Sequence, residues 1–76
     1  MSKEQALNKL YSIFNKASSR VEKYHLATID ALWFVILDIK VQNKAEFVQH
    51  ELFDLLKNDF NIKTHGIGYI LDLKNN

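Results

Sequence analysis

The chain has 76 residues, of which 47% are hydrophobic and 25% are charged. This composition excludes intrinsic disorder, collagen-like repeats and low-complexity sequence. Ten Lys and Arg residues against nine Asp and Glu residues give a formal net charge of +1, without the basic excess of proteins held mainly by phosphate contacts. With no Cys and no Pro, a single domain over residues 1–76 has no disulfide to support it, so we expect it to pack tightly or to associate.

Three pairs of residues have the spacing of a helix start, in which a Ser or Asn precedes a Glu or Gln by three positions. They are Ser2 with Gln5, Ser19 with Glu22, and Asn43 with Glu46. Each pair opens a stretch in which apolar residues recur every three or four positions. The sequence therefore predicts helices over about residues 3–17, 20–40 and 44–59.

The second predicted helix becomes apolar on all sides between Ala31 and Leu37. Such a segment is normally central, so we expect Trp33 and Phe34 in the core, with a homodimer contact through this helix as the alternative. A strand over Trp33–Ile39 competes with the helix because β-branched and aromatic residues are dense there, but no Gly or Pro lies nearby to break a helix.

No membrane contact is expected from the sequence. The apolar run at residues 31–37 is much shorter than the roughly 20 residues that cross a bilayer. The first residues also lack the basic region and apolar stretch of a secretory signal. We therefore expect a cytoplasmic protein.

The last part of the chain changes pattern and contains both glycines, Gly66 and Gly68. Apolar and polar residues alternate on each side of them, which predicts a small β-hairpin that turns near residues 65–68. A two-stranded hairpin is marginally stable alone, so it has to pack on the helices or pair with another edge. The expected fold class is therefore mainly α, of the α+β type, with three helices and a short C-terminal hairpin.

Residues 62–71, with the sequence Ile-Lys-Thr-His-Gly-Ile-Gly-Tyr-Ile-Leu, resemble the C-terminal wing of winged-helix effector domains in bacterial response regulators. Val48, Leu52 and Leu55 are spaced like the buried positions of that family's recognition helix. The resemblance covers about the last third of the chain and implies a winged-helix-like geometry. The third predicted helix departs from the family because it presents Glu46, Glu51 and Asp54 where basic residues would face DNA.

The third predicted helix carries the candidate contact surface. Glu46, His50 and Asp54 follow one another at four-residue spacing, and Phe47 and Phe53 flank them. This acidic and aromatic face predicts a protein partner; the alternative is that both rings fold back onto the second helix or the hairpin. The same face could mimic nucleic acid toward a basic protein, although the balanced charge argues against it. The His and carboxylate spacing could also hold a metal, but without Cys or a second ligand pair we expect no metal and no cofactor.

We therefore expect a small regulatory module that acts by stoichiometric binding, as an inhibitor or adaptor of a larger protein. An enzyme is not expected, because the sequence has no nucleophile and base set and no phosphate-binding loop. The alternative function is a winged-helix DNA-binding regulator. In that case Lys57, Lys63 and His65 would contact the nucleic acid.

Overall fold

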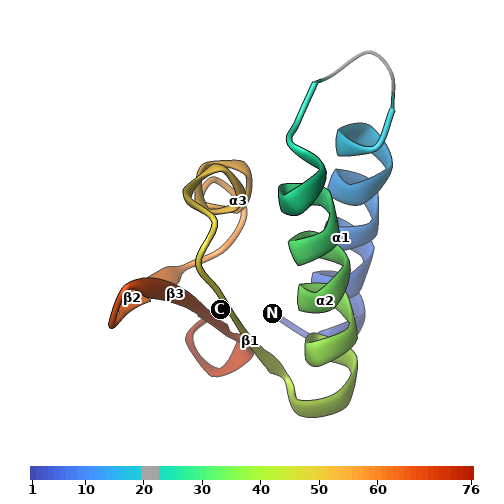
Figure 1. The fold of residues 1–76 in the computed structure, drawn as a ribbon. Helices are drawn as coiled ribbons and strands as arrows, with labels where there is room; N and C mark the ends of the chain where they lie inside the picture. The colour runs from blue at the N-terminus through green and yellow to red at the C-terminus, as the bar shows by residue number, and fades with distance from the viewer. Residues whose placement is uncertain (20–22) are drawn as a thin grey trace.

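The structure is a computed structural model that describes residues 1–19 and 23–76, and Figure 1 shows its arrangement. Three helices and a small antiparallel sheet make up the described chain, so the predicted α+β class with a C-terminal hairpin is confirmed. In chain order the elements are α1 (Lys3–Ala17), α2 (Leu26–Gln42), β1 (Lys44–Phe47), α3 (His50–Leu56), β2 (Ile62–His65), β3 (Gly68–Asp72) and the 3-10 turn η1 (Leu73–Asn75).

Helix α1 begins and ends as the sequence predicts. The Ser2 hydroxyl accepts a hydrogen bond from the Gln5 backbone N–H at 3.1 Å, and the Gln5 side chain accepts one from the Ser2 N–H at 3.0 Å. This reciprocal box satisfies two N–H groups that a helix start otherwise leaves unpaired. Ala6 and Leu10 are fully buried, because α1 packs along α2 in the helix pair of Figure 1.

Helix α2 is buried on one side only. Its core-facing residues recur at helical spacing and are Thr28, Leu32, Val35, Ile36 and Ile39. The prediction that Trp33 and Phe34 lie in the core is wrong, since their exposed fractions are 41% and 63%. The predicted start of this helix falls on residues 20–22, outside the described part of the chain, and the described helix begins at Leu26.

The predicted third helix is wrong over its first residues. Asn43 does not start it but ends α2 in the left-handed conformation, with φ of 64° and its N–H bonded to the Ile39 carbonyl at 3.2 Å. The chain then extends as β1, which buries Ala45 and Phe47 on one face and exposes Lys44 and Glu46 on the other. Glu46 and Phe47 therefore belong to a strand, and α3 begins only at His50.

The sheet has the order β1-β3-β2, with β3 antiparallel to both neighbours. The predicted hairpin forms between β2 and β3, where His65 pairs with Gly68 across a two-residue turn. Gly66 takes φ of 59° at the first turn position, which fits the type II′ turn that suits twisted strands. Gly68 is needed for space: a Cβ there would lie 2.6 Å from the Phe47 carbonyl oxygen.

One hydrophobic core joins the helices to the sheet. It is built around Leu10 from α1, Leu32 and Ile36 from α2, Leu52 from α3 and Leu71 from β3, all with no exposed area. Helices α1 and α2 lie on one side of the core and the sheet with α3 lies on the other (Figure 1). Among the described residues, none of the helices combines the length and the apolar character needed to cross a lipid bilayer.

Candidate partner-binding surface

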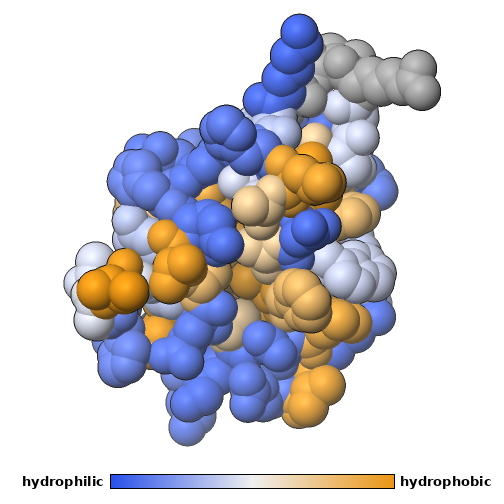
Figure 2. Space-filling model, in the orientation of Figure 1, coloured by the Kyte–Doolittle hydropathy of each residue, from blue (hydrophilic) through white to orange (hydrophobic). Residues whose placement is uncertain are grey.

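A groove separates the first half of α2 from the end of β1 and the hairpin turn. Its volume is about 630 Å³, and it is open along one side. In Figure 2 it appears as a hollow between apolar side chains over α2 and a second apolar group over the hairpin. The residues that line this groove are Ala27, Asp30, Ala31, Phe34, Glu46, Phe47, Val48, Gln49, His65, Ile67, Gly68 and Tyr69.

The walls of the groove are apolar and exposed. Phe34 of α2 stands on one side, and Val48 and Ile67 stand on the other. Ile67 is 95% exposed at the tip of the hairpin turn, where a polar residue is more common than a large apolar one. Ala27 and Ala31 leave room between these side chains because they are small. The arrangement leaves large apolar groups in water around a concave space, which is typical of an interaction site.

The rim of the groove is acidic. Asp30 projects from α2 and Glu46 from β1, and both are exposed. His65 lies beside Glu46, with 3.6 Å between its Nε2 and the Glu46 Oε1. Of the described residues that line the groove, none is Lys or Arg. The groove therefore favours an apolar ligand that also carries positive charge.

The two rings predicted to face a partner instead pack against the hairpin. Phe47 is buried on β1, and its ring lies 5.4 Å from that of Tyr69 on β3. Phe53 stacks on the same Tyr69 ring from α3, with 4.6 Å between the centroids. This is the alternative arrangement left open by the sequence, because the strand turns Phe47 inward and α3 lies directly over the sheet. Phe47 lines the groove, and Phe53 stacks on the Tyr69 ring that also lines it.

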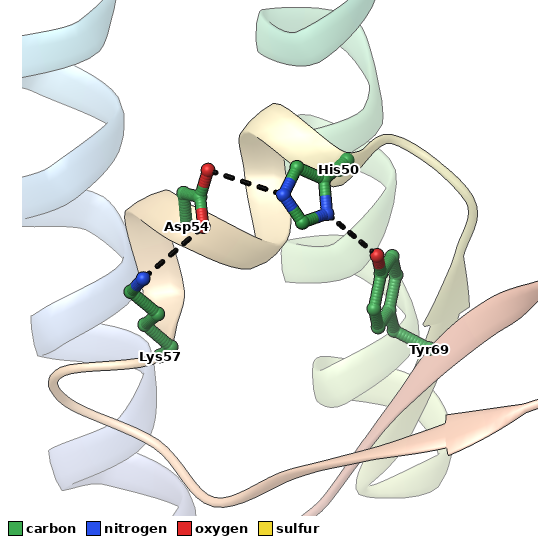
Figure 3. A network of polar contacts seen from close by, with 4 residues as sticks. All are labelled: His50, Asp54, Lys57 and Tyr69. Carbon is green, nitrogen blue, oxygen red and sulfur yellow. Dashed lines mark hydrogen bonds and ion pairs between the residues drawn. The ribbon is translucent and has the colours of Figure 1, made fainter.

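His50 and Asp54 belong to an exposed polar network on α3, drawn in Figure 3. The His50 Nδ1 lies 2.8 Å from the Tyr69 hydroxyl, and its Nε2 lies 3.4 Å from Asp54. Lys57 donates a hydrogen bond to Asp54 at 3.2 Å. The network ties the helix to β3 at the side of the aromatic stack. It holds the short helix in place and leaves His50 exposed.

The start of α2 is capped from α3, a contact that the sequence analysis missed. The Glu51 carboxylate accepts a hydrogen bond from the His25 backbone N–H at 3.0 Å, at the residue that precedes α2. That bond, together with a hydrogen bond from the Thr28 side chain, holds the pKa of Glu51 below its ordinary value. A carboxylate at a helix start is also favoured by the helix dipole. Glu51 therefore fixes the end of α2 that lies beside the groove.

The residues predicted to contact nucleic acid do not form one basic patch. Lys57, which directly follows α3, is paired with Asp54, and the His65 ring on β2 lies 3.6 Å from Glu46. Lys63 lies exposed on β2, an edge strand of the sheet. Val48, predicted to be buried in a recognition helix, is exposed and precedes α3. The positive charge of Lys57 is thus partly compensated by a neighbouring carboxylate.

The helical spacing of Glu46, His50 and Asp54, which could have suited a metal, is not present in the structure. Glu46 lies on β1, so it does not share a helical face with His50 and Asp54. Over residues 1–19 and 23–76, no group of three or more His, Cys, Asp or Glu side chains has a geometry that could hold a metal ion.

Comparisons with known proteins add no family to these observations. No family model, no curated protein and no solved structure matched this chain.

The groove residues that sequence analysis missed are chiefly Val48 and Ile67. The exposed Ile at a hairpin turn was the available signal, since that position favours small polar residues.

Proposed function

We propose that this protein is a small regulatory interaction module that binds a larger protein stoichiometrically, as its inhibitor or adaptor. The groove between α2 and the hairpin is the contact surface in this proposal. The main support for this function is the groove itself, a concave space with exposed apolar walls and an acidic rim. An unbound surface of this kind is costly in water, and a partner that covers it recovers that cost.

The walls supply the affinity. Phe34, Val48 and Ile67 surround the hollow, so one partner segment can contact all three at once. Fully burying a side chain of this type contributes about 1.5–3 kcal/mol. The freedom of motion lost on association offsets part of this gain. Apolar anchors grouped around a pocket are the usual origin of hot-spot energy in protein interfaces.

The rim supplies the selectivity. Asp30 and Glu46 lie on opposite walls and both carboxylates are accessible. A partner segment with apolar side chains and a neighbouring Lys or Arg would satisfy both the walls and the rim. A segment with an acidic residue at that place would be repelled. The proposed partner is therefore an apolar and basic segment of a larger protein.

The test is capture of the partner by groove variants. Purified protein is used to isolate a stoichiometric partner from the native host, with nuclease treatment in one arm, and binding is then measured with the two purified components. Val48→Glu and Ile67→Glu should each weaken binding at least tenfold, because each places a charge on an apolar wall. The matched control is Thr64→Glu, which places the same charge at an exposed β-branched position of β2 that does not line the groove.

Equal binding by the wild type, Val48→Glu and Ile67→Glu would exclude the groove as the contact surface. Phe47 is not a suitable site for this test, because its ring is buried and a charge there would damage the core. Phe53 is also packed against the core. The two selected positions are exposed, so their variants should keep the circular dichroism spectrum of the folded chain.

The second candidate function is DNA binding through the hairpin, as the wing resemblance implies. The observation in its favour is the hairpin itself, with Lys63 and His65 exposed on its outer strand. Loss of the captured material only after nuclease treatment would favour this function. Lys63→Ala with His65→Ala should then weaken DNA binding and reduce its dependence on salt, and an unchanged gel shift would remove this candidate.

A further inference from the structure

A second exposed apolar surface runs along α2 and borders the groove. We define the α2 stripe as Leu26, Trp33, Phe34, Leu37 and Val41. At about 100° per residue these positions share the side of the helix opposite the buried residues Leu32 and Ile39. Figure 2 shows apolar side chains along the length of α2 on the face toward the viewer. Phe34 lies at the border between the stripe and the groove.

The stripe is large for a chain of this size. Side chains of this class present roughly 150–250 Å² each when fully accessible, so the stripe exposes on the order of 500–700 Å². The largest apolar patch on an ordinary monomer is about 300–600 Å². A standard interface buries about 800 Å² on each partner, which the stripe approaches before its polar neighbours are added. Together with those neighbours, the stripe approaches the area of one face of a stable dimer.

The order of side chains along the stripe is self-complementary. Aliphatic residues stand at its two ends, Leu26 and Val41, and the aromatic pair Trp33 and Phe34 stands midway between them. If two α2 helices pack antiparallel about a two-fold axis through the middle of the stripe, Leu26 of each helix meets Val41 of the other. The aromatic pairs at the two centres then meet each other. A two-fold interface requires this kind of match between one surface and itself.

The centre of the stripe is held in place before any association. Trp33 packs on Phe14 of α1, with 5.3 Å between the ring centroids. Lys40 lies over the Tyr11 ring at 5.2 Å, so its charge is directed toward α1. The charged side chain that interrupts the stripe is Asp30, which lies among its residues on the first turns of α2. A surface that is fixed, nearly uncharged and convex suits a copy of itself better than a flexible or basic ligand.

We propose that a second copy of this chain covers the α2 stripe, with the two α2 helices packed antiparallel around Trp33 and Phe34. Association then supplies the support that a chain of 76 residues without disulfides otherwise lacks. Val48 and Ile67 lie across the groove and stay exposed in this dimer. The dimer can be measured without a known partner, so the proposal does not rest on the proposed function, although both surfaces use Phe34.

Sedimentation of the purified chain across a concentration series tests the proposal. The wild type should sediment as a dimer at micromolar concentration, with a blue shift of the emission of its single Trp as the dimer forms. Leu26→Glu and Val41→Glu should each weaken the dimer about a hundredfold. Each substitution occurs twice in a two-fold interface, and each occurrence should weaken it roughly tenfold. Ile67→Glu is the matched control and should leave the dimer intact.

The antiparallel arrangement has its own test, because the chain has no Cys of its own. A mixture of Leu26→Cys and Val41→Cys chains should be joined by a short thiol cross-linker. Leu26→Cys alone should not be, since its two thiols would lie about 22 Å apart along the helix axes. A wild type that remains monomeric at several hundred micromolar, dissociation by Ile67→Glu, or efficient cross-linking of Leu26→Cys alone would each overturn the proposal. Circular dichroism verifies that every variant is folded.

Discussion

The groove and the α2 stripe are both apolar and exposed, and they share Phe34, but they differ in shape and charge. The groove is concave, is built from two helix turns, a strand end and a hairpin turn, and has Asp30 and Glu46 on its rim. The stripe is convex, lies on one helix and is nearly uncharged. A concave acidic site can select a basic segment of another protein, whereas a convex, symmetric stripe matches a copy of itself. Exposed apolar area alone does not identify the partner.

The largest effect is expected at the residue the two surfaces share. Phe34→Glu places a charge on both, so partner binding and self-association should each weaken by about a hundredfold or more. Phe34 is 63% exposed and lies outside the core, so the free energy of unfolding of the monomer should change little. Sedimentation and binding to the purified partner measure the two losses. A Phe34→Glu chain that keeps both activities would show that neither surface is used.

Gly68→Ala should distort the groove and leave the α2 stripe unchanged. Its Cβ would lie 2.6 Å from the Phe47 carbonyl oxygen and 3.1 Å from the Val48 side chain, so β1 has to move relative to β3. We expect a loss of about 1–3 kcal/mol in the free energy of unfolding, as for other overpacked sites. Partner binding should weaken because the wall of the groove shifts.

The α2 stripe does not include this region, so the dimer formed by folded Gly68→Ala chains should keep its dissociation constant. Denaturant unfolding and sedimentation provide the two measurements. Gly66→Ala is the companion variant, because its Cβ would have nothing within 4 Å and its cost would come only from the left-handed backbone.

Asp30→Asn should change the two surfaces in opposite directions. The carboxylate lies on the rim of the groove and also interrupts the stripe. Its removal should strengthen the dimer a few-fold, because a charge near the interface no longer has to lose water. The same change should weaken a basic partner a few-fold. Titrations of the dimer and of the partner complex measure the two dissociation constants. A change of both in the same direction would contradict the role given to the Asp30 charge.

The smallest effect is expected at Glu51, which caps α2 and lies on neither surface. Hydrogen bonds to its carboxylate hold its pKa below the ordinary value of about 4.5, so this stabilisation is present above that pH and is lost as the pH falls through the lowered pKa. Glu51→Gln should be slightly less stable at pH 7, and the difference from the wild type should shrink in acid. Denaturant unfolding at both pH values measures it, and a constant difference would exclude the cap.

Local signals in the sequence predicted α1 and the hairpin. The Ser2 and Gln5 box and the Gly66 turn each complete their hydrogen bonds or backbone geometry within a few residues, so nearby sequence is sufficient. Strand β1 was missed because its pairing partner, β3, lies far along the chain. A local reading gave Asn43 the role of a helix start, whereas it ends α2 in a left-handed conformation.

The candidate surfaces were harder to predict for a related reason. A helix that is apolar on all sides has no periodic signal to tell its buried face from its exposed one, so Trp33 and Phe34 were assigned to the core. The groove depends on Val48 and Ile67 meeting α2, which requires the position of the sheet. The Glu51 cap joins α3 to the start of α2 and likewise has no local pattern.

The central position of β3 also sets the order in which the molecule can fold. Strands β2 and β3 are joined by a two-residue turn, and such hairpins form in about 1–10 μs. Strand β1 precedes both in the chain but pairs with β3, so its addition has to close a long loop that contains α3. We therefore expect the wall of the groove to form late. The α2 stripe needs only α2 and its contacts with α1, and we expect it to form earlier.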